Sequence, residues 1–343
     1  MIKCSIIITT HNRPNELRVS LQSLANQTLN WSLYKIIVID NYSYDHGVAT
    51  QKVCKEIKKN YPLLHLEYHH EEVAGGITYS KNKWTQLVDS EIIIFGDDDY
   101  IADNLLIESC IECFEDRSIG IVVGPLLPKF ETDIPPDWVN NLWETNQFGS
   151  HITDFTILDF GAQKKVIPYH FAFWSNLAVR KDVFMESNGF GPDGFAGDKV
   201  YYNGNGEHHL NQFVEESGYK IVYCPLMLAK HRIFPYRFSR NYFSSRNFYY
   251  GIGDSFNLSR KSHRPLSLFS RMKYAFRMLF NLSYIDKPKP LRFANLWRLH
   301  GFLNHQSLLR KNPKFLEFVL LDSWIDYDFT SMPPLKAGPS FMK

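Results

Sequence analysis

Apolar residues follow two alternating patterns over the first hundred positions. Short, unbroken apolar runs have the length of strands, and most of them are rich in isoleucine, as is typical of strands buried on both faces. These runs cover residues 4–10, 34–39, 63–68 and 92–95. Between them, apolar side chains recur every three or four positions after Pro14 and over residues 49–59 and 78–87. This alternation predicts an α/β fold with a mostly parallel sheet and helices on both faces.

Polar side chains gather where the apolar runs end. The residues at these ends are Thr9, Thr10, Asn12, Arg13, Asp40, Asp97, Asp98 and Asp99. Because the carboxyl ends of parallel strands meet at one edge of a sheet, where open α/β folds bind ligands, these groups predict a binding site. Three adjacent carboxylates repel one another unless a cation is present, and hard oxygen ligands suit Mg²⁺ or Mn²⁺. Strand-like alternation would turn Asp98 away from its two neighbours.

The composition is that of a globular protein, with 343 residues, 44% hydrophobic and 22% charged. The chain opens with Met1 and enters a strand at once, so we expect no signal peptide. We also expect no transmembrane helix, because no apolar run reaches about 18 residues. The five cysteines are scattered and odd in number, which fits a reducing compartment and a cytoplasmic location.

Positive charge is concentrated late in the chain. Residues 230–314 contain 18 Lys and Arg but 2 Asp and Glu, although the whole chain has a net charge of only +2. Arginines alternate with aromatic residues over 236–253, a pattern that can also bind single-stranded nucleic acid. Over 260–282, apolar residues recur at helical spacing between basic ones, namely Leu266, Phe269, Met272, Phe276 and Phe280. A basic amphipathic helix favours an anionic membrane surface, not nucleic acid, as the partner. The alternative is a helical cap packed on the rest of the chain.

Six segments resemble, in their order and spacing, the motifs of family 2 glycosyltransferases with the GT-A fold. They read SIIITTHNR (5–13), IIVIDNYSYD (36–45), GITYSKN (76–82), FGDDDY (95–100), WSNLAVRKDVF (174–184) and GNGEHHLNQFVEESGYKIVYCP (204–225). The resemblance implies a nucleotide-sugar-binding GT-A domain and inverting glycosyl transfer. We expect a catalytic domain over 1–235, with a nucleotide-binding half (1–103) and an acceptor half (104–235). A helical, basic C-terminal extension would cover 236–343.

The resemblance also implies roles for individual side chains. The donor, a nucleoside diphosphate sugar, would be bound by Thr9, Thr10, Asn12, Arg13, Asp40, Lys81, Asp97 and Asp98. Asp40 would accept a hydrogen bond from the base, and Asp97 would contact the ribose. Lys81 stands where the family usually has Arg, and an ammonium lacks the bidentate fork of a guanidinium. Asp99, together with His231, would hold the Mn²⁺ or Mg²⁺ that bridges the diphosphate.

Glu207 is the candidate catalytic base, because one carboxylate must take the proton of the attacking acceptor hydroxyl. Asp198 is the reserve candidate. The second acid of the family's motif is replaced by His208 in this chain. Residues 128–143, which mix prolines and tryptophans, predict a loop over the donor or acceptor pocket.

These observations predict an enzyme that transfers a sugar to a saccharide or lipid-linked saccharide, in cell-surface polysaccharide or glycan synthesis. It would sit on the cytoplasmic face of the membrane as a peripheral protein. A nucleotidyltransferase is one alternative, but a basic, glycine-rich loop is expected there, and residues 9–13 contain no glycine. A binding protein that holds a nucleotide or glycan without turnover is the other alternative, with His208 as the mark of lost chemistry.

Overall fold

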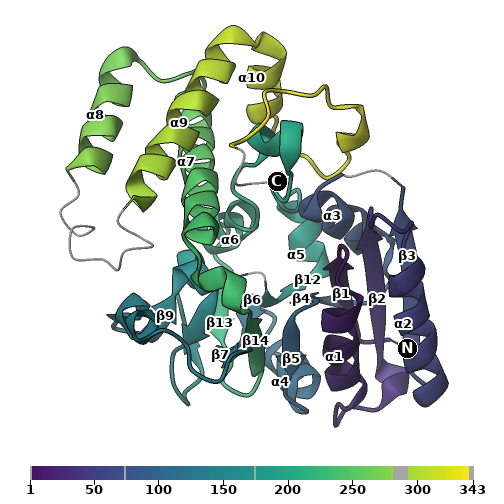
Figure 1. The fold of residues 1–343 in the computed structure, drawn as a ribbon. Coiled ribbons are helices and arrows are strands. Elements are labelled where there is room, and N and C mark those ends of the chain that lie inside the picture. The colour runs from purple at the N-terminus through teal and green to yellow at the C-terminus, as the bar shows by residue number, and fades with distance from the viewer. Residues whose placement is uncertain (1, 73–74, 174, 281–292, 340–343) are drawn as a thin grey trace.

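A computed structural model describes residues 2–72, 75–173, 175–280 and 293–339 of the chain. Its larger sheet has eight strands in the order β11-β13-β6-β12-β4-β1-β2-β3 (Figure 1). The strands are β1 (Cys4–Thr10), β2 (Tyr34–Asn41), β3 (His65–Glu71), β4 (Ile92–Asp97), β6 (Ile119–Val123), β11 (Lys165–Val166), β12 (Asn176–Arg180) and β13 (Lys220–Tyr223). β1 to β4 pair in parallel, whereas β12 runs antiparallel between β4 and β6. The predicted α/β fold is confirmed, although β3 begins two residues later and ends three residues later than the apolar run suggested.

Helices cover both faces of this sheet. They are α1 (Pro14–Ala25), α2 (Val48–Asn60), α3 (Ile77–Leu87), α4 (Leu106–Cys113), α5 (Lys181–Glu186) and α6 (His208–Glu216). Because successive strand residues point to opposite faces, Ile6 and Ile8 pack with α1, α2 and α4, while Ile7 packs on the other face with α5 and α6. The sheet is therefore buried on both sides, which explains its unbroken apolar strands. All five cysteines are buried and free within these elements and the adjoining turns.

A second, six-stranded sheet lies beside the first and was not predicted. Its order is β5-β14-β7-β10-β9-β8. The strands are β5 (Tyr100–Ala102), β7 (Leu126–Phe130), β8 (Glu144–Asn146), β9 (Gly149–Ile152), β10 (Ile157–Asp159) and β14 (Ala229–Ile233). The prediction of a loop over 128–143 is thus wrong at its start, because Pro128 belongs to β7. β14 runs in parallel with β7. It places His231 opposite Tyr100 of β5, the residue that follows the three aspartates in the sequence.

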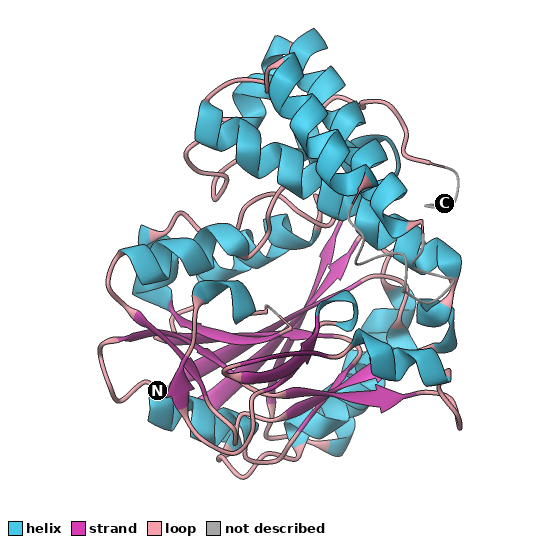
Figure 2. Ribbon diagram, turned by 90° about the vertical axis from the view of Figure 1, so that its left-hand side faces the viewer, coloured by secondary structure: helices cyan, strands magenta, loops and turns pink. Residues whose placement is uncertain are grey.

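The C-terminal part of the chain is helical. Its helices are α7 (Arg240–Ser262), α8 (Leu268–Leu279), α9 (Ala294–Lys311) and α10 (Pro313–Val319). The expectation of one amphipathic helix over 260–282 is wrong, because α7 ends at Ser262 and residues 281–292 lie outside the described residues. His263 adopts a left-handed backbone conformation, Pro265 follows, and the Ser267 side chain accepts a hydrogen bond from the Ser270 amide as the N-cap of α8. Figure 2 shows these helices at one end of the molecule and the strands at the other.

Two glycines set the distance between α7 and α9, which lie side by side and parallel (Figure 1). A Cβ atom on Gly251 would collide with the carbonyl oxygen of Arg298, and one on Gly301 would collide with that of Phe248. α8 packs on α9 through Tyr274, whose ring stacks on Phe302 with centroids 3.6 Å apart.

A polar contact also joins α7, α8 and α9. Tyr274 of α8 donates to the carboxylate of Asp254 in α7, which also receives two hydrogen bonds from Arg298 of α9.

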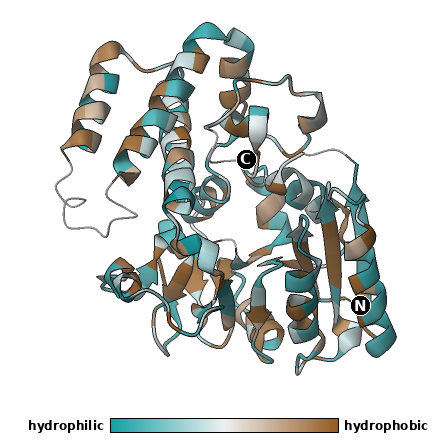
Figure 3. Cartoon of the chain, in the orientation of Figure 1, coloured by the Kyte–Doolittle hydropathy of each residue, from teal (hydrophilic) through white to brown (hydrophobic). Residues whose placement is uncertain are grey.

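Figure 3 shows apolar residues along the central strands, where they are covered, and along α8, which forms the outer edge of the molecule. No helix among the described residues combines the length and the apolar character that crossing a membrane requires.

Candidate functional site

The carboxyl ends of β1 and β4 form the edge of a cavity of about 240 Å³, which we call the strand-end pocket. Parallel pairing sets Thr9 opposite Asp97. Seven of the predicted site residues line this pocket, namely Thr9, Thr10, Arg13, Asp97, Asp98, Asp99 and His231. Residues far apart in the sequence therefore meet where the parallel strands end, as that topology requires.

Asp98 points into this site and not away from it. Its carboxylate accepts hydrogen bonds from the Thr10 hydroxyl and from Arg13, both at 2.7 Å. β4 ends at Asp97, so the strand alternation that would have turned Asp98 outward no longer applies. Burial raises the pKa of Asp98, and Arg13 opposes that shift.

Asp99 is almost fully buried and is surrounded by basic side chains. Its carboxylate lies 2.6 Å from Arg237, 3.1 Å from Arg13 and 3.3 Å from His231. Burial alone would raise the pKa of Asp99, but the charges of His231, Arg237 and Arg13 outweigh it and hold this pKa well below its usual range. Asp99 is therefore an anion at neutral pH.

The donor atoms of Asp99 and His231 suit a divalent cation in type. The Nδ1 atom of His231 donates to the carbonyl of Phe155 at 2.8 Å, so Nε2 is the ring nitrogen that faces Asp99. The guanidinium of Arg237 spans the two, 2.6 Å from Asp99 and 3.1 Å from His231 Nε2. Among the residues that the structure describes, no cluster of three or more His, Cys, Asp or Glu side chains could hold a metal ion. A cation at Asp99 and His231 would therefore need further ligands from a phosphate substrate.

Three other predicted donor residues lie beside the pocket and do not line it. Lys81 is fully buried, with its ammonium 3.9 Å from Asp97, and burial lowers its pKa. Asp40 is fully buried too, and one of its oxygens accepts from the Ser43 amide while the other has no hydrogen-bond partner among the described residues. Asn12 joins the turn after β1 to the loop after β2, because its amide donates to Ser43 and its side chain accepts from the Tyr44 amide.

A second cavity of about 480 Å³, which we call the Glu207 pocket, lies between the main sheet's helices and α7. Glu207 is half-buried at the N-terminal end of α6. Burial raises its pKa to about 7, and the nearby charge of Asp193 adds to this shift. The pKa of Asp193, which lines the same pocket, is raised by burial to about 6. A carboxyl group titrating near neutral pH beside a cavity has the properties of a general base.

Asp198, the reserve candidate for the base, does not reach either pocket. It is exposed, and its carbonyl accepts a hydrogen bond from Leu335 of the C-terminal tail. Asp193 is the acidic residue that the fold brings to the Glu207 pocket instead. Its place is set by Thr78 of α3, whose hydroxyl accepts from the Asp193 amide at 2.9 Å. His208 also lines the pocket, and burial lowers its pKa, so it is neutral at pH 7.

Two arginines of residues 236–253 belong to the site, and no pattern in the sequence singles them out. Arg237 and Arg246 both line the strand-end pocket, and Arg246 lines the Glu207 pocket as well. Both fall in the arginine- and aromatic-rich segment, where composition alone could not separate pocket residues from surface ones. The only usable signal was that this segment follows His231 closely in the sequence.

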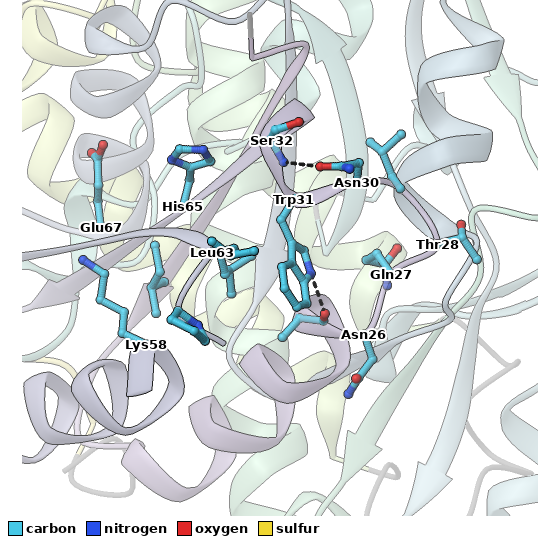
Figure 4. A pocket seen from close by; sticks show the side chains of 15 residues that line it. Asn26, Gln27, Thr28, Asn30, Trp31, Ser32, Lys58, Leu63, His65 and Glu67 are labelled. Atoms are coloured by element: carbon cyan, nitrogen blue, oxygen red, sulfur yellow. Dashed lines mark hydrogen bonds between the residues drawn. The ribbon is translucent and has the colours of Figure 1, made fainter. Parts of the chain in front are cut away.

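A larger cavity, of about 1140 Å³, lies elsewhere, and the described residues that line it include none of the carboxylates and arginines of the other two (Figure 4). It is formed by residues 25–32 and 62–67, which lead into β2 and β3 at the amino ends of the strands. The hydrogen bonds there are local, for example from Trp31 to the carbonyl of Ala25 and from the Ser32 amide to Asn30. No cluster of carboxylates faces it among the described residues, so the two smaller pockets are the candidate site.

Known proteins resemble this chain in sequence and in structure. Glucosyl-dolichyl phosphate glucuronosyltransferase of Haloferax volcanii is 21% identical over 267 residues, which cover 73% of this chain and 75% of the relative. Poly(ribitol-phosphate) beta-N-acetylglucosaminyltransferase TarP of Staphylococcus aureus is 25% identical over 124 residues, 36% of each chain. The mannosyltransferase PcManGT from Pyrobaculum calidifontis, solved with GDP-Man and Mn²⁺, matches 95% of this chain and 88% of its own with a TM-score of 0.52 and 14% identity.

The family model described as glycosyl transferase family 2 matches residues 5–186, more than half of the chain. This range contains β1 to β4 and the three aspartates, and it supplies most of the residues that line the strand-end pocket, although His231, Arg237 and Arg246 lie outside it. The likeness to PcManGT supports the same GT-A architecture at the level of the fold. The chain therefore belongs to glycosyl transferase family 2 and is a glycosyltransferase with the GT-A fold.

Proposed function

We propose that this glycosyltransferase moves a sugar from a nucleoside diphosphate donor in the strand-end pocket to an acceptor hydroxyl in the Glu207 pocket, with inversion at the anomeric carbon. One observation carries the proposal: the two pockets share Ile77, Thr156 and Arg246 in their linings. A donor in one pocket and an acceptor in the other would therefore meet at this shared wall.

The residues of the chain would divide the work between the two pockets. Thr9, Thr10, Arg13 and Asp97 would bind and orient the donor. Glu207 would take the proton of the acceptor hydroxyl as its oxygen attacks the anomeric carbon. A single displacement from the side opposite the leaving group inverts the configuration. The buried ammonium of Lys81 would offset the negative charge of Asp97 in the strand-end pocket and that of Glu207 in the other pocket.

We assign a divalent cation, Mn²⁺ or Mg²⁺, to Asp99 and His231. When bound, such a cation neutralises charge on the diphosphate and favours its departure. The imidazole of His231 is held by the carbonyl of Phe155, so its free nitrogen stays directed at Asp99. Arg237 and Arg13 supply positive charge to the same carboxylate in the absence of the cation.

A saccharide or lipid-linked saccharide is the proposed acceptor, in the synthesis of a glycan or cell-surface polysaccharide. The names of the two relatives, which refer to a dolichyl phosphate-linked sugar and to a poly(ribitol phosphate), support such acceptors. The Glu207 pocket offers aromatic rings and amides, including Tyr249, Tyr250 and Asn257, of the kind that bind sugars.

α8 is the proposed contact with an anionic membrane, at the cytoplasmic face. Leu268, Phe269, Met272, Phe276 and Leu279 are exposed on this helix, and Lys273 and Arg277 lie beside them. The excess of basic residues over 230–314 complements an anionic lipid surface. An enzyme held in this way would work close to a lipid-linked acceptor.

Release of nucleoside diphosphate from a panel of UDP-, GDP- and dTDP-sugars, with Mn²⁺ or with EDTA, tests the function. Glu207→Gln should lower turnover by about 10²–10⁴-fold, the usual contribution of a general base. Donor affinity should stay within about threefold, because the base acts on the acceptor. Glu216→Gln, an exposed acid of the same helix, is the matched control and should behave like the parent. Saturable donor binding without turnover of any donor would instead indicate a binding protein.

A further inference from the structure

Arg246 is the one charged residue among the three that line both pockets, since the other two are Ile77 and Thr156. It belongs to α7, outside the segment that the family model matches. In the proposed reaction, the bond to the leaving diphosphate breaks at the wall between donor and acceptor. A cation at this wall lies where negative charge grows during the reaction.

The side chain of Arg246 is held in place from two sides. Its guanidinium carbon lies 5.4 Å from the centre of the Tyr250 ring, one turn further along α7. One terminal nitrogen donates to the carbonyl of Thr153 at 3.4 Å, which is a weak contact. The Nε atom is buried and has no hydrogen-bond partner among the described residues. The guanidinium is thus a pre-oriented cation at the wall between the two pockets, which is the arrangement that favours binding of a developing anion.

The charge of Arg246 reaches the acceptor side too. It lowers the pKa of both Glu207 and Asp193, although burial dominates in each case. Among the basic residues near it, Arg237 and Arg13 are paired with Asp99 and Asp98, and Arg298 is paired with Asp254. Burial would lower the pKa of Arg246, but Tyr250, Tyr242 and Asp154 outweigh it and raise that pKa, so Arg246 is charged at the shared wall.

We propose that Arg246 is a catalytic residue that donates hydrogen bonds to the diphosphate leaving group. This inference rests on the proposed function. The acceptor oxygen forms its bond to the anomeric carbon while the bond from that carbon to the phosphate oxygen breaks, and the electron pair goes to the diphosphate. The acceptor proton goes to Glu207. The guanidinium keeps its own protons and stabilises the charge on the departing oxygen.

Binding measurements test the contact without any need for turnover. UDP, GDP, UMP and GMP are titrated by calorimetry in the presence of Mn²⁺. The nucleotides with the more tightly bound nucleobase, uracil or guanine, are then used for the variants. Arg246→Met should weaken the diphosphate by about tenfold or more and the monophosphate by less than about threefold, because a charge-assisted contact to the second phosphate is lost. Arg264→Met, an exposed arginine after α7, is the matched control and should change neither affinity.

Single-turnover rates with the active donor test the catalytic role. Arg246→Met should lower this rate by about 10²–10³-fold, the usual cost of losing one such donor, and Arg246→Lys should lie in between. Millimolar guanidinium should restore part of the rate to Arg246→Ala, but ammonium should not. Equal losses of monophosphate and diphosphate affinity, or no rescue by guanidinium, would overturn the assignment. If the parent binds diphosphate through Arg246 but turns over no donor, the proposed function fails while the contact stands.

Discussion

At the scale of single residues, the chemistry of Glu207 is set by the side chains around it. Burial raises its pKa to about 7, and Asp193 adds to the shift, while Lys81 and Arg246 act in the opposite direction. These groups come from different elements, namely α3, α7 and the segment before α6. If Glu207 is the catalytic base, as proposed, the activity of the enzyme should depend on pH in the physiological range.

In a plot of turnover against pH, Asp193→Asn should move the low-pH side of the curve, its acid limb, to lower pH. Glu207 works as a base only when deprotonated, so activity falls as the pH drops through its pKa. Asp193 is mostly ionised at pH 7, and its negative charge raises the pKa of Glu207. Removing that charge lowers the pKa, and the limb should shift by roughly one unit or less. A turnover profile from about pH 5 to 9 measures this.

Asp198→Asn is the control for that profile. Asp198 is exposed and lies outside the Glu207 pocket, so its limb should coincide with that of the parent. An unchanged limb in Asp193→Asn, or a shift to higher pH, would show that Asp193 does not act on the base.

Sequence reasoning located strand-end residues better than loop residues. Thr9, Asp97 and Asp99 line the strand-end pocket because parallel pairing fixes where strands end. Asp40 also ends a strand, yet the turn after β2 uses its carboxylate to accept from the Ser43 amide. Asp193 and Asp198 lie five positions apart in one irregular segment, where no periodicity tells which faces the pocket.

At the scale of elements, the crossing of α7 and α9 depends on two glycines. Each glycine lies against a backbone carbonyl of the facing helix, Gly251 against Arg298 and Gly301 against Phe248. Backbone atoms cannot rotate away from an added methyl group as a side chain can. The close approach matters for the site, because α7 carries Arg246 and α9 carries Arg298 into the Glu207 pocket.

Gly251→Ala should lower the free energy of unfolding by about 1–3 kcal/mol, because overpacking forces the helices apart. Helix propensity alone predicts the opposite sign, a gain of about 0.5–1 kcal/mol on replacing a helical glycine by alanine. Urea unfolding followed by circular dichroism decides between them. Asn241→Ala, at an exposed position of the same helix, should not destabilise the protein. A stabilised Gly251→Ala would mean that the crossing is looser than described.

Elements were predictable where apolar periodicity is long and unbroken. The β1 to β4 strands and α1 to α3 follow from such patterns, and these four strands pair in parallel as predicted, whereas β11 and β12 pair antiparallel with their neighbours. The second sheet could not be predicted, since β5, β8 and β10 are three residues long and offer no period to detect. The division between α7 and α8 depends on His263 and Pro265, which interrupt a continuous apolar pattern.

At the scale of the whole molecule, the C-terminal part of the chain supplies both an exposed apolar helix and two arginines of the pockets. The basic segment was expected to face a membrane, and its helix α8 does expose apolar side chains. The same segment also sends Arg237 and Arg246 into the pockets. Charge counted along the chain could not distinguish these two uses, because only the fold decides which arginines turn inward.

The protein should sediment with anionic vesicles at low salt, bind neutral vesicles weakly and be released at high salt. Basic residues near an anionic surface contribute about 1 kcal/mol each. Salt should weaken this attraction, since the Debye length is only about 8 Å at 0.15 M. Phe269 and Phe276, 78% and 64% exposed, should enter the interface.

A double variant identifies the surface involved. Phe269→Ser with Phe276→Ser should reduce vesicle binding, whereas Leu63→Ser, which removes a similarly exposed apolar side chain far along the sequence, should not. If the parent stays in the supernatant with anionic vesicles at low salt, α8 does not bind the membrane and is part of a helical cap on the rest of the chain. A soluble acceptor is then expected.

The shared carboxylate of Asp254 has a mechanical consequence. Tyr274 of α8 and Arg298 of α9 both bind it, and Asp254 and Arg298 form part of the Glu207 pocket wall. Asp254 therefore links the outer helix α8 to the wall of the Glu207 pocket through hydrogen bonds. If α8 rests on a bilayer, these hydrogen bonds of Asp254 fix the distance of Glu207 from the lipid headgroups. The enzyme would then select acceptors by the distance of their reactive hydroxyl from the membrane.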